Sequence, residues 1–207
     1  MNIADALRNA NSTLDAAGLK EPQKDARLLL GFALERPKEF LFAHPEYELS
    51  DAEEEAFAEA LDRRARHEPV QHITGTAEFY GLEFSVSPAV LIPRPETEIL
   101  VEKAVKVLKD NNAVRFCEIG VGSGCISVSM LTELPNASAI AVDRSPDALE
   151  VARRNAKRHN VLDRLDLRLS DVFDSVAEDG FDAVVSNPPY ISLAEVATLD
   201  REVRDFE

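Results

Sequence analysis

The chain has 207 residues, with 45% hydrophobic and 29% charged residues, which is typical of a globular protein with one large domain or two smaller ones. Its formal net charge of −15 argues against nucleic acid as a direct partner, because an acidic surface repels a phosphate backbone. No apolar run approaches the roughly 20 residues that a membrane-spanning helix needs, so no membrane partner is expected. The amino terminus is typical of an amphipathic helix and not of a signal peptide, which makes a cytoplasmic location the default.

Two runs of basic side chains could form a local basic patch. They are Arg63, Arg64 and Arg66, and Arg153, Arg154, Lys157 and Arg158. Both runs lie at helical spacing among acidic residues, which favours solvated helix faces over a binding surface. The two cysteines, Cys117 and Cys125, lie in apolar segments without metal-type spacing, so we expect buried thiols in a reducing compartment and no metal site.

Residues 1–70 are predicted to form a small helical bundle. Pro22 opens a helix, a short helix or turn covers about 37–43, and Ser50 with Glu53 forms the capping-box pattern of a further helix. No constellation of metal ligands or nucleophiles occurs in this stretch. Its predicted role is therefore docking or substrate choice, with the chemistry elsewhere.

Residues 71–92 are predicted to link this bundle to a second domain. The stretch 79–86 holds two short β-type runs around Gly81, which is typical of a hairpin. Pro93 and Pro95 then forbid regular structure and predict a stiff connector that runs into a helix.

Residues 93–207 are predicted to form an α/β domain. Strands are expected at 114–119, 137–142, 165–169 and 181–186, with helices at about 124–134 and 146–159 between them. Repeated strand–helix–strand units imply a parallel, doubly wound sheet. The last strand is rich in β-branched residues and is expected to be buried.

A glycine-rich turn follows the first of these strands, directly after Glu118. It consists of Gly120, Val121, Gly122, Ser123 and Gly124. Its glycines predict a tight turn at which a ligand approaches bare backbone amides. The GxGxG spacing is tighter than the dinucleotide pattern GxGxxG, but such a turn alone fits dinucleotide enzymes nearly as well.

Polar residues also follow the other predicted strands. Asp143 ends the second strand, where it is placed to accept hydrogen bonds from ribose hydroxyls. Asp171 follows the third strand, where it could bind an adenine amino group while Val172 and its apolar neighbour cover the ring. After the fourth strand come Asn187, Pro188, Pro189 and Tyr190. Two consecutive prolines must end the strand, which leaves the Asn187 amide at the edge where ligands bind in open α/β sheets.

These residues resemble a class I S-adenosylmethionine-dependent methyltransferase. An Asn-Pro-Pro-Tyr run on that scaffold is shared by enzymes that methylate planar nitrogens: adenine methyltransferases of DNA, some guanine methyltransferases of ribosomal RNA, and glutamine methyltransferases of release factors. Residues 69–75 (PVQHITG) and 91–98 (LIPRPETE), with the helical N-terminal domain, resemble the last group, the PrmC/HemK family. The resemblance covers essentially the whole chain.

The resemblance implies a fold and a set of roles. The fold would be a helical bundle followed by a Rossmann-like methyltransferase domain that is incomplete at its C-terminal end. Glu118 and the glycine-rich turn would hold the methionine part of S-adenosyl-L-methionine, Asp143 the ribose, and Asp171 with Val172 the adenine. Asn187 would contact both cofactor and substrate. The catalytic group would be Asn187, Pro188 and Tyr190, and Pro189 would complete the pocket for a glutamine side chain.

The resemblance also implies a reaction. The enzyme would methylate the glutamine in the Gly-Gly-Gln loop of peptide chain release factors and leave S-adenosyl-L-homocysteine. A glutamine amide is a poor nucleophile, so we expect the Asn187 side-chain oxygen and the Pro188 carbonyl each to accept one amide hydrogen. Tyr190 would pack against the flat amide. The cofactor's positive charge supplies the driving force, so no metal is required.

Two alternatives stay open at this point. The chain could be a nucleic-acid amino methyltransferase that uses the same Asn-Pro-Pro-Tyr site, against which the net charge of −15 argues. It could also be an inactive fragment for cofactor binding or docking. Class I sheets normally have more strands than the four predicted here, so we expect a chain truncated at its C-terminus, with an exposed edge on its fourth strand.

Overall fold

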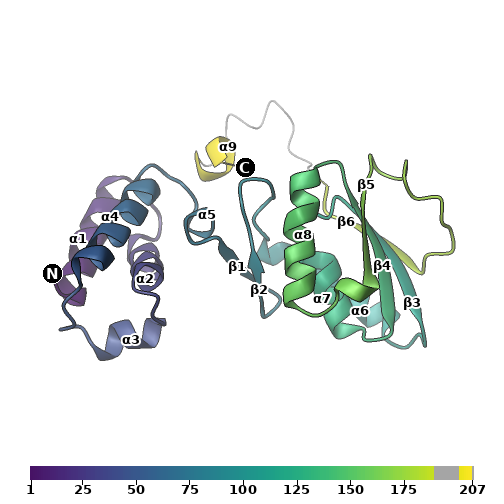
Figure 1. The fold of residues 1–207 in the computed structure, drawn as a ribbon, viewed down its shortest axis with the longest axis horizontal. Coiled ribbons are helices and arrows are strands. Elements are labelled where there is room, and N and C mark those ends of the chain that lie inside the picture. The colour runs from purple at the N-terminus through teal and green to yellow at the C-terminus, as the bar shows by residue number, and fades with distance from the viewer. Residues whose placement is uncertain (189–200, 207) are drawn as a thin grey trace. The chain divides into compact units, whose positions relative to one another are not determined.

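The computed structural model describes residues 1–188 and 201–206, and its contacts divide the chain into two units (Figure 1). The first unit comprises residues 1–74 together with helix α9 (Arg201–Phe206). The second unit begins at Gly75. The functional boundaries expected after residues 70 and 92 stay predictions.

The first unit is helical, as the sequence predicts. Besides α9, its helices are α1 (Ile3–Ala16), α2 (Pro22–Ala33), α3 (Lys38–Ala43), α4 (Asp51–Ala65) and α5 (Val70–Thr74). The capping box is confirmed, since Ser50 Oγ accepts a hydrogen bond from Glu53 N–H while the Glu53 carboxylate accepts one from Ser50 N–H. The short helix α5 was not predicted. It forms because Val70 and Ile73, three residues apart, both pack into the core of the bundle.

A buried ion pair crosses this helical unit. Arg64 of α4 and Asp25 of α2 are only 5% and 6% exposed, and Arg64 Nε donates to Asp25 Oδ2 at 2.8 Å. The same guanidinium donates to the backbone oxygen of Glu68 at 3.0 Å and to Glu202 Oε1 of α9 at 2.7 Å. The prediction of a solvated helix face is therefore wrong for Arg64. Its acidic partner lies 39 positions away, beyond the reach of helical spacing.

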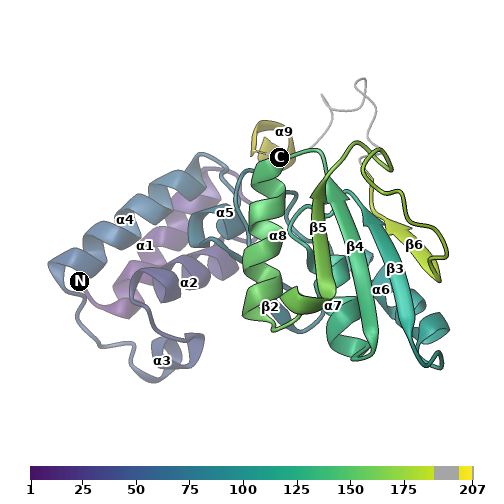
Figure 2. The same ribbon diagram turned by 45° about the vertical axis from the view of Figure 1, so that its right-hand side comes forward.

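The parallel sheet of the second unit is confirmed (Figure 2). Its strands are β3 (Val114–Ile119), β4 (Ala137–Asp143), β5 (Leu165–Leu169) and β6 (Ala183–Ser186), paired in the order β5-β4-β3-β6. The helices of this unit are α6 (Pro95–Leu108), α7 (Cys125–Glu133) and α8 (Pro146–Arg158), and Leu162–Arg164 forms one short 3₁₀ turn. The chain adds β4 and β5 on one side of β3 and then returns to add β6 on the other. This reversal beside β3 is where open α/β sheets form a ligand crevice.

Side chains of alternate strand residues face opposite sides of the sheet. On one side Phe116, Ala139 and Val185 join a core to which α6, α7 and α8 also contribute. Strand residues of the other side, such as Ser138 and Val184, lie outside that core, and Val184 is 53% exposed. The expected burial of the fourth strand is therefore wrong for Val184. Within residues 1–188 the helices of this unit pack against one face of the sheet. The doubly wound arrangement that was predicted, with helices on both faces, is not seen there.

A β-hairpin precedes α6 in the chain. Strands β1 (Thr76–Phe79) and β2 (Leu82–Ser85) pair antiparallel across Tyr80 and Gly81, whose φ angles of 53° and 71° are those of a hairpin turn. Asn155 of α8 anchors β2, because its amide accepts from Ser85 N–H at 2.7 Å and donates to Ser85 O at 2.9 Å. By its contacts the hairpin belongs to the second unit.

We predict that Arg64→Ala lowers the free energy of unfolding of the first unit by about 3–5 kcal/mol, because it leaves the Asp25 carboxylate buried without its partner. Urea denaturation followed by circular dichroism measures this effect. Arg66→Ala is the matched control, since the Arg66 side chain is 67% exposed and pairs with Asp62 on the helix surface. We expect a change of at most about 0.5 kcal/mol for the control. Equal effects of the two substitutions would contradict the role assigned to the buried pair.

Candidate functional site

A hollow lies at the edge of the sheet where β3 and β6 end. Its walls come from the stretch 91–97, from Glu118, from the glycine-rich turn with the start of α7, and from Asn187. Its volume is about 60 Å³. Ligand pockets usually measure roughly 300–1,000 Å³, so the hollow has room for only one end of a ligand of cofactor size.

The glycine-rich turn makes hydrogen bonds to its own neighbourhood. The N–H groups of Gly120 and Val121 both donate to Val142 O at 2.9 Å, and that of Gly122 donates to Asp143 Oδ2 at 2.9 Å. The expectation of bare amides is wrong for these residues, because the end of β4 already uses them. The glycines allow the tight turn because they adopt positive φ angles, +75° at Gly120 and +53° at Gly122, which other residues rarely adopt. Apart from the neighbouring residues in the chain, an added Cβ at either position would meet no atom within 4 Å, so both face open space.

Glu118 occupies the N-terminal end of α7. Its side chain is 1% exposed and accepts hydrogen bonds from the N–H of Ser127, at 3.0 Å, and from the Ser127 hydroxyl. Burial raises the pKa of the Glu118 carboxyl to about 8. Dinucleotide enzymes place a pyrophosphate at such a helix end, and here the protein's own carboxyl group takes that position. At this helix end the Ser127 N–H is therefore occupied by the protein's own carboxyl group and is not available to a phosphate.

Asp143 joins the glycine-rich turn to the start of α8. Its Oδ2 accepts from Gly122 N–H at 2.9 Å and its Oδ1 from Ser145 N–H at 3.0 Å. Ser145 caps α8 next to it, since Ser145 Oγ accepts a hydrogen bond from Ala148 N–H. A carboxylate oxygen has more than one lone pair, so Asp143 can hold the turn and still accept hydrogen bonds from two ribose hydroxyls.

Asp171 and Val172 are both exposed and lie outside the hollow. The N–H of Ser170 donates to Asp143 O at 3.0 Å, which brings the end of β5 next to that of β4. Val172 has a φ angle of 49°, a left-handed conformation that costs a β-branched residue about 1–3 kcal/mol. Ser170 Oγ holds it there by donating to Val172 O at 3.2 Å. Their predicted contact with an adenine ring stays a prediction.

Asn187 lies beside the glycine-rich turn. Ser186 Oγ donates to Ile119 O at 2.9 Å and so ties the end of β6 to the end of β3. The half-buried Asn187 amide then donates from Nδ2 to Thr97 Oγ1 at 3.1 Å. Pro188 is exposed, and the predicted substrate-site residues Pro189 and Tyr190 lie outside the described residues.

Two positioning contacts were missed by the sequence analysis. Thr97 lies in the run LIPRPETE, from which only the resemblance to a family was inferred. Its contact with Asn187 joins residues 90 positions apart. Asn155 Nδ2 donates to Ser123 O at 2.8 Å, in addition to its bonds with Ser85, and so ties the glycine-rich turn to the hairpin. Neither contact leaves a periodic signal in the sequence, because both join elements far apart in the chain.

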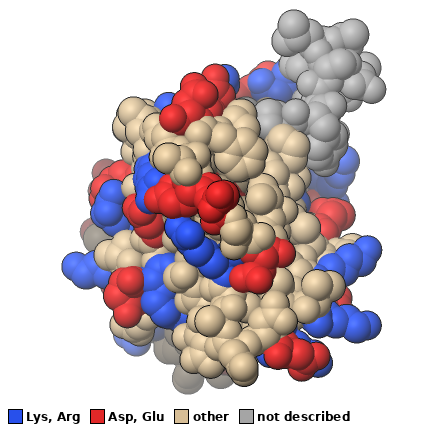
Figure 3. Space-filling model, turned by 90° about the vertical axis from the view of Figure 1, so that its right-hand side faces the viewer, with Lys and Arg blue, Asp and Glu red and all other residues tan. Residues whose placement is uncertain are grey.

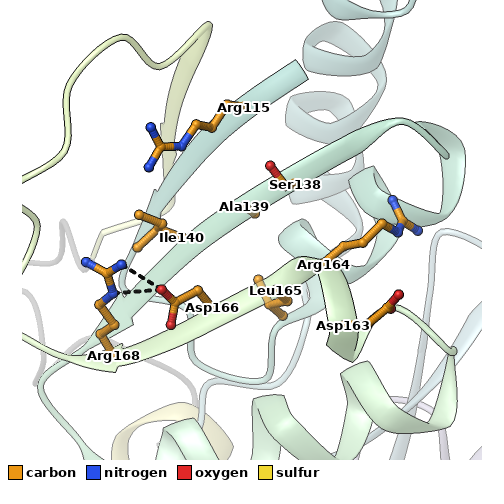
Figure 4. A pocket seen from close by; sticks show the side chains of 9 residues that line it. All are labelled: Arg115, Ser138, Ala139, Ile140, Asp163, Arg164, Leu165, Asp166 and Arg168. Atoms are coloured by element: carbon orange, nitrogen blue, oxygen red, sulfur yellow. Dashed lines mark hydrogen bonds and ion pairs between the residues drawn. The ribbon is translucent and has the colours of Figure 1, made fainter. Parts of the chain in front are cut away.

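A larger hollow of about 300 Å³ lies on the sheet face that the core does not use (Figure 4). Its arginines are already engaged. Arg168 pairs with Asp166 at 2.6 Å, Arg164 donates to three backbone oxygens, and Arg115 lies over the ring of Phe181 at 5.0 Å. Of the three, only Arg168 pairs with carboxylates within the described residues, and Arg164 is already bonded to backbone oxygens, so the hollow is not a preformed anion site.

The described part of the chain holds no group of three or more His, Cys, Asp or Glu side chains that could bind a metal ion. None of its helices is long and apolar enough to cross a membrane. On the face shown in Figure 3, acidic and basic side chains are interspersed and do not gather into one basic field. Arg153, Arg154, Lys157 and Arg158 are exposed on α8, as predicted.

Comparisons with known proteins decide the family. Residues 5–75 match the model of the PrmC N-terminal domain, and residues 96–201 match that of the methyltransferase small domain. The release factor glutamine methyltransferase of Koribacter versatilis is 42% identical, over 100% of this chain and 74% of that protein. The chain belongs to the release factor glutamine methyltransferase family. The relative from Nitratidesulfovibrio vulgaris is 43% identical, over 97% of this chain and 68% of that protein.

Some relatives of this methyltransferase family are much longer than the chain. The bifunctional methyltransferase of Rickettsia typhi is 41% identical over 100% of this chain, which spans 43% of that protein. The bifunctional methyltransferase of Rickettsia bellii is 40% identical, again over the whole chain and over 42% of that protein.

Gly124 is predicted to tolerate substitution less well than Gly122. Both have positive φ angles, so an alanine costs about 1–2 kcal/mol of backbone strain at either position. At Gly124 the new Cβ would also lie 3.2 Å from Ala152 Cβ and 3.3 Å from Ala152 Cα, which adds about 1–3 kcal/mol. Thermal unfolding of Gly124→Ala and Gly122→Ala measures the difference. A variant of Gly124 as stable as that of Gly122 would contradict the close packing of α8 against the turn.

Proposed function

We propose that the chain transfers a methyl group from S-adenosylmethionine to the side-chain amide nitrogen of a release-factor glutamine. One observation carries the proposal: the Asn187 amide lines the same hollow as the glycine-rich turn, at the strand-order reversal beside β3. An amide at this position could orient a substrate nitrogen toward the cofactor's methyl group. The substrate follows from relatives named release factor glutamine methyltransferase that match nearly the whole chain.

The residues of the site could hold the separate parts of S-adenosylmethionine. The open Gly120 and Gly122 backbone leaves room for the methionine end, and Glu118 offers a carboxyl group to a positively charged ligand. Asp143 keeps free lone pairs for the ribose hydroxyls, and Asp171 with Val172 would flank the adenine. When bound, the cofactor supplies an electrophilic methyl on sulfur, and its transfer leaves S-adenosylhomocysteine while the amide nitrogen loses one proton to water.

The protein's contribution is to orient a weak nucleophile. The lone pair of a primary amide is delocalised into its carbonyl, so the nitrogen must be held in line with the methyl group. The Asn187 side-chain oxygen and the Pro188 carbonyl would each accept one of its hydrogens. These bonds strengthen as positive charge develops on the nitrogen, which lowers the barrier of the transfer step. The predicted packing of Tyr190 on the flat amide would add orientation.

The helical unit would bind the body of the release factor. It matches the PrmC N-terminal domain over residues 5–75, and we assign it no chemical role. Its buried Arg64–Asp25 pair would hold α2 and α4 in a fixed arrangement, so that a protein partner meets a preformed surface.

The principal test offers labelled S-adenosylmethionine to the chain with a release factor that carries the Gly-Gly-Gln loop. We expect the label on that protein, and none when its glutamine is replaced by alanine. Nucleic acid serves as a competing acceptor in a parallel reaction. Label on the nucleic acid, or on both versions of the release factor, would overturn the proposed substrate. Calorimetry that detects no cofactor binding would leave only a docking function.

Asn187→Ala is predicted to reduce methyl transfer by at least about a hundredfold, because the substrate amide loses an acceptor that acts in the transition state. Cofactor affinity should change by less than about threefold, since most cofactor contacts come from other residues. Asn187→Asp provides a matched control that retains the oxygen acceptor. Transfer at the wild-type rate by Asn187→Ala would refute the orientation mechanism.

Cofactor affinity is predicted to rise by about tenfold between pH 7 and pH 9, because Glu118 titrates near pH 8 in the free protein. A positively charged ligand favours the ionised carboxylate, so below pH 8 binding must first displace a proton and is weakened. Calorimetry across this range measures the slope. Glu118→Gln is the control, because it keeps an oxygen for Ser127 and cannot ionise. The same pH profile in both proteins would contradict the role of Glu118, since the cofactor's own titration is common to the two.

A further inference from the structure

We propose that Thr97 is the positioning residue that fixes which end of the Asn187 amide faces the substrate. The inference rests on the proposed function and extends it, since it states how the site presents an acceptor, and not a donor, to a primary amide. Thr97 contacts neither the substrate nor the cofactor in this scheme. It acts through Asn187 alone.

The contact has the geometry of a specific hydrogen bond. Asn187 Nδ2 lies 3.1 Å from Thr97 Oγ1, and both residues line the hollow that contains the glycine-rich turn. Thr97 is 9% exposed, so water competes poorly for its hydroxyl. The hydroxyl comes from the first turn of α6, which begins at Pro95, so it is carried by a rigid element.

An asparagine amide has two chemically opposite ends of similar size. With the NH₂ group directed at Thr97, the Asn187 oxygen is the end that remains for a ligand. A rotation by 180° would place the NH₂ group there instead, opposite the N–H groups of a glutamine amide. Donors would then face donors, and the substrate nitrogen would lose an acceptor. A hydroxyl can donate as well as accept, and here Thr97 Oγ1 is the acceptor, so the bond holds the amide in the orientation that the transfer reaction requires.

The first turn of α6 is itself anchored next to Thr97. Glu98 Oε1 accepts a hydrogen bond from Tyr80 N–H at 2.8 Å, which ties the turn to the hairpin. Thr97 N–H donates to Arg94 O at 2.9 Å, and Val101, one turn further along, is fully buried. Two adjacent side chains of the run LIPRPETE thus have separate tasks. Glu98 fixes the helix end, and Thr97 uses that fixed position to orient Asn187.

The test replaces Thr97 by valine, which has the same shape and cannot hydrogen-bond, and by serine, which keeps the hydroxyl. We expect Thr97→Val to lower kcat for methyl transfer to a release factor by about tenfold, the usual cost of one lost orienting hydrogen bond. KM and the calorimetric cofactor affinity should stay within about twofold, because valine keeps the shape of the threonine side chain in the wall of the hollow. Thr97→Ser should restore kcat. A kcat of Thr97→Val equal to that of the wild type would overturn the inference.

A second measurement needs no activity. In ¹⁵N-labelled protein the side-chain NH₂ signals of Asn187, assigned by their absence in Asn187→Asp, report the bond directly. We expect slowed hydrogen exchange of these protons in the wild type and in Thr97→Ser, and exchange faster by about tenfold or more in Thr97→Val. Equal exchange in all three proteins would overturn the inference.

The two measurements separate this inference from the proposed function. If the wild-type chain methylates no release factor, the proposed function fails for this chain, and the exchange experiment still decides whether Thr97 orients Asn187. If the wild type is active and Thr97→Val is equally active, the proposed function stands and the positioning role falls. Loss of activity together with lost cofactor binding in Thr97→Val would indicate a structural role and would also overturn the inference.

Discussion

The site depends on one constraint, the position of β3 between β4 and β6. Because all three strands run parallel, their carboxyl ends meet at one edge, and the last residues of each strand are brought together. Val142 O binds the glycine-rich turn from one side, and Ser186 Oγ binds Ile119 O from the other. The turn and Asn187 are therefore held against the same strand end, although they are more than sixty positions apart.

The hydrogen bonds of the glycine-rich turn determine which ligands it suits. In a phosphate-binding loop the backbone N–H groups and the helix N-terminus point at the ligand. Here Gly120, Val121 and Gly122 donate to β4, and Glu118 occupies the end of α7. The Glu118 carboxyl group thus takes the place at the helix end that a phosphate occupies in a phosphate-binding loop. It can favour a positively charged ligand only when it is ionised, that is, above about pH 8.

Local patterns predicted the secondary structure well, because caps, prolines and periodic apolar residues act within a few positions. The capping box at Ser50, the helix starts at Pro22 and Pro95, and the strand ends at Ile119 and Leu169 all follow from such signals. What could not be predicted are side-chain contacts between distant elements. The burial of Arg64 required its partner on α2, and the exposure of Val184 required knowledge of which sheet face the helices cover.

In the candidate site, too, local position could be predicted and contacts between distant residues could not. The sequence alone predicted that Asn187 lies at a strand end. It did not predict the orientation of the side-chain amide, which depends on a hydroxyl 90 positions away. This explains why LIPRPETE is a more specific motif than the glycine-rich turn. A tight turn needs only glycines, which many sites share, whereas the first turn of α6 needs Pro95 to begin the helix, Glu98 to hold the hairpin and Thr97 to face Asn187. Three independent requirements in four residues make a pattern that chance rarely satisfies.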